Sequence, residues 1–154
     1  MAHSPQYASS LAEDELTQGG IIERVEDEDE LRERLMRDRY ANAYLLGKLD
    51  PAYVPFCRWY GQRDEAGQLT DVLLWYQGLS IPVAFLVAGQ HDPRAFFAAC
   101  CQTLPSRFHF HIISDQMTAF REACKVAHYQ PMHRMGLERG VYKPLDQGGL
   151  SGRV

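Results

Sequence analysis

Two histidines of this chain are spaced so that they could share a ligand. His109 and His111 lie two residues apart in a stretch with strand character, so both side chains point to the same face of a sheet. Two imidazoles on one face could bind zinc, but a zinc site needs further ligands. Cys124, His128 and His133 are available, and no spacing brings them to the pair. We therefore expect the pair to serve in packing, and we predict no metal site.

The four cysteines, Cys57, Cys100, Cys101 and Cys124, form no C-x-x-C motif. This usage is typical of a reduced cytoplasmic chain rather than of a disulfide scaffold. Cys100 and Cys101 follow two phenylalanines in a segment with helical periodicity, and neighbouring residues of a helix point in different directions. We therefore expect them to lie in the core rather than to carry out thiol chemistry.

Recognisable catalytic motifs are missing from the sequence. It contains no glycine-rich phosphate loop, no G-x-S-x-G and no H-E-x-x-H. Asp64, Glu65 and Asp71 flank a predicted turn, where carboxylates are normally solvated rather than shifted in pKa for acid–base catalysis. We predict no catalytic, cofactor-binding or metal-binding residue. One candidate pocket for a small molecule remains, formed by aromatic and imidazole side chains: Trp59, Tyr60, Trp75, Tyr76, His109 and His111.

The elements that must position these residues follow from the hydrophobic periodicity. A helix begins at Asp27, which can cap it with Glu30 in the reciprocal capping position, and its charges form a solvated face around Leu31 and Leu35. Residues 81–88 are apolar on both faces, which predicts a strand covered from both sides. The other expected elements are a helix over 42–49, a hairpin of 56–62 and 69–77, a helix after Asp92-Pro93, a strand over 107–113, a helix from Ser114 to about His128 and a strand over 132–138.

The composition bounds the class of protein. The 154 residues are 45% hydrophobic and 23% charged, with a net charge of −4, which is typical of a soluble globular domain and argues against binding to nucleic acid or an anionic membrane by bulk charge. No apolar stretch is long enough to span a bilayer, so we expect a soluble, cytoplasmic protein. We expect a flexible leader over 1–20, one domain over 21–144, and a linker-like tail over 145–154.

One stretch resembles a known family. Residues 39–49 read RYANAYLLGKL, a predicted hairpin follows over 56–77, and 135–137 read MGL. This pattern resembles the N-terminal region of two-part GNAT-superfamily N-acetyltransferases, in which an NAYLLG helix precedes a GNAT-like half-domain and the catalytic acetyl-CoA-binding domain follows. The resemblance implies an α/β, GNAT-like mixed-sheet sandwich with helices on both faces.

The sequence departs from a catalytic GNAT domain at the cofactor loop. Such a domain carries [QR]-x-x-G-x-[GA] between a strand and a helix, because backbone amides and a helix N-terminus must hold the pyrophosphate of acetyl-CoA. Here the strand over 81–88 is followed by GQHDP, with proline and aspartate where donors and positive potential are needed, and the nearest approach, RWYGQR over 58–63, lies in a hairpin. The resemblance therefore implies a degenerate GNAT fold.

The expected function is a non-catalytic N-terminal domain that supports or shapes the substrate side of a catalytic, acetyl-CoA-dependent domain. The resemblance implies acetyl-CoA as cofactor of the parent protein and none in this segment, with a catalytic GNAT domain of the same chain or a homodimer partner packed against it. Two alternatives stay open. One is an independent small-molecule-binding or enzymatic domain that uses the candidate pocket, and the other is a homodimerising module with exposed Tyr40, Tyr44 and Tyr53.

Overall fold

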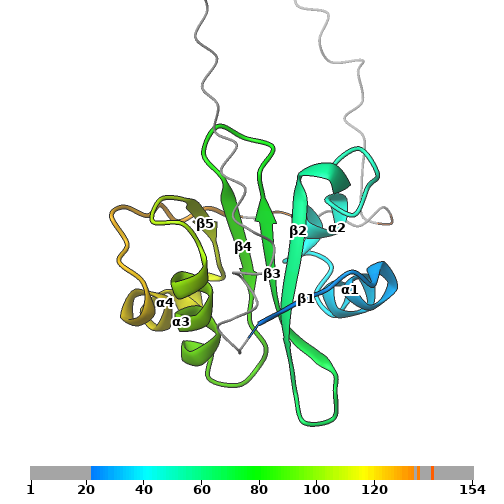
Figure 1. Ribbon diagram of the computed structural model, residues 1–154, viewed down its shortest axis with the longest axis horizontal. Coiled ribbons are helices and arrows are strands. Elements are labelled where there is room, and N and C mark those ends of the chain that lie inside the picture. Colours follow the sequence, from blue (N-terminus) through cyan, green and yellow to red (C-terminus); the bar gives the residue numbers. More distant parts are fainter. Residues whose placement is uncertain (1–21, 134, 136–139, 141–154) are drawn as a thin grey trace, which may run out of the picture.

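The computed structural model describes residues 22–133, 135 and 140, and these form a five-stranded mixed sheet with helices on both faces (Figure 1). The strand order is β1-β2-β3-β4-β5, with antiparallel neighbours except for the parallel pair β4–β5. The expected α/β class is thus confirmed. The strands are β1 (Glu23–Arg24), β2 (Cys57–Arg63), β3 (Leu69–Tyr76), β4 (Val83–Val87) and β5 (His109–His111).

The hairpin of β2 and β3 confirms the strand prediction from period-two alternation. Its turn closes with a hydrogen bond from the Gly67 amide to the Asp64 carbonyl (2.9 Å), and Asp64 Oδ1 accepts from the amides of Ala66 and Gln68. Gly67 has a φ of 79°, a conformation that glycine adopts without a Cβ clash. Within β2, a Cβ on Gly61 would collide with the side chain of Leu69, so this strand position needs a glycine.

The alternation of β4 confirms that both faces of the sheet are covered. Val83, Phe85 and Val87 belong to one apolar cluster, and Ala84 and Leu86 belong to the other. The first cluster packs against α1 (Glu28–Met36) and α2 (Ala43–Gly47), and the second packs against α3 (Arg94–Thr103) and α4 (Met117–Ala123). Figure 1 shows these two pairs of helices on opposite sides of the sheet.

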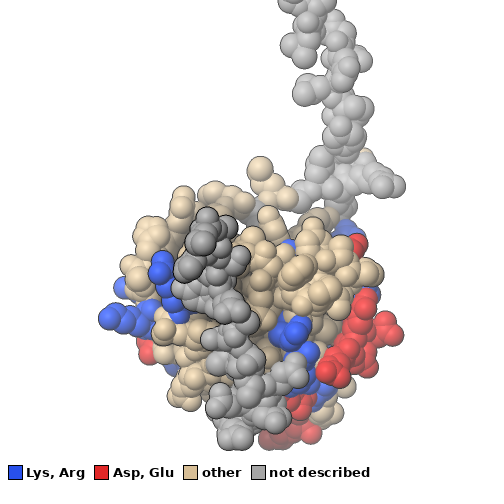
Figure 2. All heavy atoms as spheres, turned by 45° about the horizontal axis from the view of Figure 1, so that its top comes forward, with Lys and Arg blue, Asp and Glu red and all other residues tan. Residues whose placement is uncertain are grey.

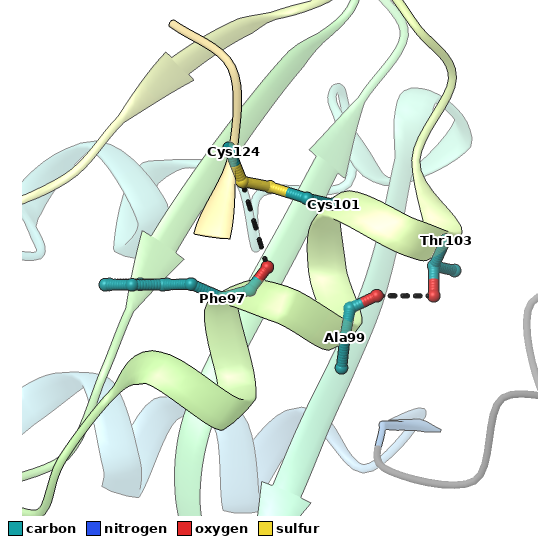
Figure 3. Close-up of a disulfide and its surroundings, with 5 residues drawn as sticks. All are labelled: Phe97, Ala99, Cys101, Thr103 and Cys124. Atoms are coloured by element: carbon teal, nitrogen blue, oxygen red, sulfur yellow. Dashed lines mark hydrogen bonds between the residues drawn. A yellow bond between two sulfur atoms is a disulfide. The ribbon is translucent and has the colours of Figure 1, made fainter. Parts of the chain in front are cut away.

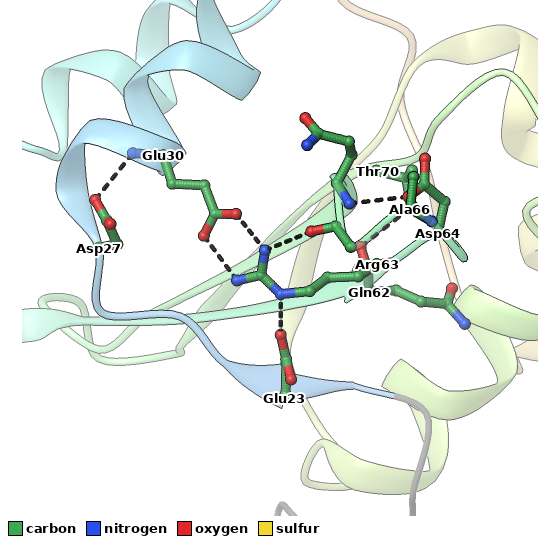
Figure 4. Close-up of polar contacts among 10 residues, drawn as sticks. Glu23, Asp27, Glu30, Gln62, Arg63, Asp64, Ala66 and Thr70 are labelled. Carbon is green, nitrogen blue, oxygen red and sulfur yellow. Dashed lines mark hydrogen bonds and ion pairs between the residues drawn. The ribbon is translucent and has the colours of Figure 1, made fainter.

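Helix α1 has the predicted start, because the Asp27 side chain accepts a hydrogen bond from the Glu30 amide (3.1 Å). The Glu30 carboxylate does not return to the cap as expected. It pairs with Arg63 at the end of β2, which also binds Glu23 of β1 (Figure 4). This shared arginine ties α1 and β1 to the hairpin, and its hydrogen bond lowers the pKa of Glu30.

The charged face of α1 is not wholly solvated. Arg34 follows Leu31 by three residues, so it points inward with it and is only 8% exposed. Glu28 and Arg32 form an exposed ion pair, whereas Arg34 binds the carbonyl groups of Thr70 and Ala88. Figure 2 shows acidic side chains gathered on the side of the molecule where α1 lies.

The segment expected to form the second helix begins with a buried asparagine. Asn42 is 4% exposed, and its side-chain amide donates to the carbonyl of Leu35 at 2.9 Å. This bond fastens the start of α2 to the last turn of α1. After α2, the short 3-10 helix η1 (Val54–Phe56) leads into β2. The distinctive NAYLLG stretch therefore holds two helices together.

The C-terminal part differs most from the predictions. The helix expected from Ser114 to about His128 consists of the short 3-10 helix η2 (Ser114–Gln116) and α4, and it ends at Ala123 because Cys124 has an extended backbone. The strand over 107–113 shortens to the three residues of β5. Residues 129–133 contain no strand, and most of the strand predicted over 132–138 lies outside the described residues.

The expectation that all four cysteines are reduced is wrong for two of them. A disulfide joins Cys101 in the last turn of α3 to Cys124, and the Cα atoms of the pair are 5.9 Å apart (Figure 3). Residues 23 positions apart meet because α3 and α4 pack side by side, which no local spacing reveals. Cys57 and Cys100 are free and buried, which confirms the core position expected of Cys100, whereas Cys101 is only half-buried.

The predicted leader over 1–20 and tail over 145–154 lie outside the described residues. Among the helices of residues 22–133, none has the length and apolar character required to cross a bilayer.

Candidate functional site

The six residues of the predicted pocket do not line one cavity, because the strands that carry them alternate between two faces. Trp59 and Tyr76 point to the face covered by α1 and α2, whereas Tyr60 and Trp75 point to the face covered by α3 and α4. All four side chains are buried in these two apolar clusters. The structure therefore uses the aromatic residues of the hairpin as core.

The histidine pair of β5 lies beside β4. In the parallel register, His109 is opposite Val83 and His111 is opposite Phe85. The His111 ring stacks on the Phe85 ring with centroids 4.7 Å apart, and Tyr44 of α2 lies 6.3 Å from Phe85. His109 is exposed. His111 thus takes part in packing, as expected.

Within the described part of the chain, no three histidine, cysteine, aspartate or glutamate side chains come together in a group that could hold a metal ion. The prediction of no metal site stays a prediction, since it concerns the whole chain.

A buried carboxylate of β3 that the sequence did not predict lies beside the end of β4. Asp71 of β3 is 0% exposed, although we expected it to be solvated beside the turn. Its Oδ1 accepts from the Gly89 amide (2.9 Å), and its Oδ2 lies 2.7 Å from the Thr70 hydroxyl and 2.8 Å from His91 Nε2. These partners satisfy a group that would otherwise be costly to bury.

Arg34 brings positive charge to the same place from α1. Its Nε donates to the Thr70 carbonyl at 2.6 Å, and one of its terminal nitrogens lies 3.4 Å from the Ala88 carbonyl. Burial and the neighbouring Arg37 lower the pKa of Arg34, while the nearby Asp71 raises it. The guanidinium stays charged, because an arginine pKa begins far above neutral pH.

His91 covers this site from the loop between β4 and α3. Its side chain is 47% exposed, and its two ring nitrogens face two acceptors: Asp92 O lies 3.1 Å from Nδ1, and Asp71 Oδ2 lies 2.8 Å from Nε2. A neutral imidazole has a single N–H and can satisfy only one of them, whereas the imidazolium satisfies both. The Asp92 carbonyl, followed by Asp71, accordingly raises the pKa of His91.

Two backbone amides at the junction of β4 and α3 are already bound to carboxylates. The Gly89 amide is bound to Asp71, the Arg94 amide is bound to Asp92 Oδ1 at 3.1 Å, and Pro93 has no N–H. Both acceptors are carboxylates, so they place negative charge at the N-terminus of α3. An anionic ligand would need the positive end of the helix dipole at that place. This arrangement can anchor the loop, and it disfavours a bound phosphate.

The strand pattern contained a signal for the buried aspartate. Position 71 is in phase with Leu73 and Trp75, which are buried against α3 and α4. A charged residue in phase with buried neighbours needs a partner. The distance between Asp71 and His91 cannot be read from the sequence, in which they are 20 residues apart. The register of β3 with β4 determines this distance.

Comparison with known proteins places the chain in no family: no family model matches it, and neither does any curated protein or solved structure.

Proposed function

We propose that this chain is a GNAT-like domain that does not itself bind acetyl-CoA and that supports a catalytic, acetyl-CoA-dependent partner domain. Transfer of an acetyl group to an amine belongs to that partner. The proposal rests on the resemblance over residues 39–49 and on the two carboxylates that bind amides at the junction between β4 and α3. The mixed sheet with helices on both faces agrees with the fold that the resemblance implies.

The single observation that carries the proposal is the hydrogen bond from the Gly89 amide to the buried carboxylate of Asp71. A catalytic GNAT domain needs free amides after the equivalent strand to hold a pyrophosphate. In this chain the Gly89 amide is occupied, and a second carboxylate, Asp92, accepts from the Arg94 amide at the start of α3. A pyrophosphate would have to displace one carboxylate and approach the other, which repels it.

Calorimetric titration of the chain with acetyl-CoA tests this proposal. We expect no measurable heat of binding, whereas a catalytic GNAT domain titrated under the same conditions serves as the positive control. Micromolar, stoichiometric binding would show that the loop over residues 89–93 opens to accept the cofactor, and the proposal would be wrong.

The supporting role needs a separate test. Determining whether the natural reading frame continues past Val154 into a segment with [QR]-x-x-G-x-[GA] between a strand and a helix would identify the catalytic partner. If such a segment exists, its acetyl transfer should weaken when residues 21–144 are removed. Unchanged kcat/KM would contradict the supporting role.

A second candidate function is a homodimerising module. The tyrosines expected on the surface are exposed: Tyr40 by 44%, Tyr44 by 64% and Tyr53 by 41%. Val54 and Phe56 of η1 are also about half exposed, so apolar side chains gather near α2 and η1. Sedimentation velocity at several protein concentrations tests this candidate, since a dimer sediments faster as the concentration rises.

A further inference from the structure

The disulfide between α3 and the residue after α4 joins two half-buried positions. Cys101 and Cys124 are both partly exposed, so a small thiol can reach them. The two free cysteines differ in this respect, because Cys57 is 5% exposed and Cys100 is fully buried. Burial raises the pKa of both free thiols, which keeps them protonated and slow to exchange. Thiol–disulfide exchange is therefore expected at Cys101 and Cys124 rather than at Cys57 and Cys100.

In the reduced form, the Cys124 sulfur also has a hydrogen-bond acceptor within reach. Its Sγ lies 3.9 Å from the carbonyl oxygen of Phe97 on α3, as Figure 3 shows. A disulfide sulfur carries no hydrogen and cannot donate, whereas a thiol at the same position can. Each redox form therefore gives this sulfur a partner on α3.

The bridge closes a loop that contains the outer strand of the sheet. Between Cys101 and Cys124 the chain forms β5, η2 and α4. Strand β5 pairs with β4 over three residues, and its Phe110 packs on Phe120 of α4 with ring centroids 4.6 Å apart. Apart from the disulfide, α4 is held to α3 by ring contacts such as Phe97–Phe120 and by the exposed Arg94–Glu122 ion pair.

We propose that Cys101 and Cys124 form a reversible thiol–disulfide switch that sets how firmly α4 and β5 are held to the rest of the domain. This inference does not depend on the proposed function. In the closing direction, the two thiols lose two protons and two electrons to a disulfide oxidant, which is reduced to two thiols. In the opening direction, a reductant thiolate attacks one sulfur, and the other cysteine leaves as a thiolate that takes up a proton. A second reductant thiolate then attacks the reductant's sulfur in the mixed disulfide, which releases the first cysteine as a thiolate and forms the disulfide of the reductant.

The switch is tested in mixtures of reduced and oxidised glutathione. After equilibration, free thiols are trapped by alkylation and counted by mass spectrometry, and the melting temperature of each sample is measured. We expect the bridged fraction to follow the glutathione mixture. We also expect the oxidised form to melt about 10 °C above the reduced form, because the bridge lowers the entropy of the unfolded chain.

Matched variants assign the response to one pair. Cys101→Ala and Cys124→Ala should each abolish the redox dependence of melting, and Cys100→Ala should retain it even if the variant melts lower in both forms. Three results would overturn the proposal: four free thiols in oxidised glutathione, a bridge that persists in reduced glutathione, or equal melting temperatures of the bridged and open forms.

Discussion

Asp71 lies where β3, α1 and the loop after β4 meet, so we expect the stability of the fold to be sensitive to its substitution. Its carboxylate accepts hydrogen bonds from the loop after β4 and from its neighbour in β3, and Arg34 of α1 supplies nearby positive charge. The side chain is 0% exposed, so water cannot replace any partner that is lost.

We expect Asp71→Asn to lower the free energy of unfolding by about 3 kcal/mol. The amide keeps the size of the side chain, but it lacks the negative charge that faces His91 and Arg34. Its NH2 group also cannot accept a hydrogen bond from the donors that bind the carboxylate. Urea melts measure the change. The exposed Glu65→Gln is a matched control, with an expected change within ~0.5 kcal/mol. An equally small change for Asp71→Asn would mean that the network contributes little.

His91 should make stability depend on pH. Its folded pKa is raised above the ordinary value of 6.5, chiefly by the Asp92 carbonyl and then by Asp71. The contribution of the imidazolium is complete below the unfolded pKa and is lost as the pH rises through the folded pKa. The difference in unfolding free energy between the wild type and His91→Gln should therefore be larger in mild acid than above neutrality.

NMR titration of the His91 ring provides a direct measurement of the same effect. A midpoint above the ordinary histidine value of 6.5 is expected. A midpoint at or below 6.5 would show that the two acceptors do not hold the imidazolium.

At the scale of elements, β4 is a strand that both helical layers cover. Phe85 is 6% exposed between His111 and Tyr44 and belongs to the cluster under α1 and α2. Phe85→Ala should lower the free energy of unfolding by about 3 to 5 kcal/mol, because it removes buried apolar surface and leaves a cavity.

The control for this prediction lies on the neighbouring strand. His109→Ala should leave the fold and its urea melt nearly unchanged, since His109 is exposed on β5. A loss below about 1 kcal/mol for Phe85→Ala would place β4 at the periphery and contradict the two-layer packing.

At the scale of the whole molecule, stability should fall from the centre of the sheet to its edges. Strand β3 lies in the middle of the order β1-β2-β3-β4-β5, and its residues from Asp71 to Tyr76 are all buried. The edge strands β1 and β5 have two and three residues. Hydrogen exchange followed by mass spectrometry should find the slowest amides in β3, near the free energy of global unfolding, and faster ones in β1 and β5. Slower exchange in β5 than in β3 would contradict this order.

Local patterns in the sequence determined much of the fold. The Asp27 cap, the turn that needs Gly67, and the apolar run around β4 each depend on residues a few positions apart, so chain geometry alone links them to a helix start, a hairpin and a strand covered on both faces. The end of α4 was mispredicted, because its periodicity continues past Ala123 while the backbone of Cys124 is extended.

The candidate site and the disulfide were decided by the tertiary structure. Asp71, Arg34 and His91 come from β3, α1 and the loop after β4, and Cys101 meets Cys124 through the packing of α3 on α4. For each of these residues, the neighbouring sequence does not indicate which distant residue it contacts. Their distances depend on strand register and helix packing, which many apolar side chains set jointly. Composition and periodicity therefore specify which surfaces are buried, and only the packed structure specifies which polar groups meet there.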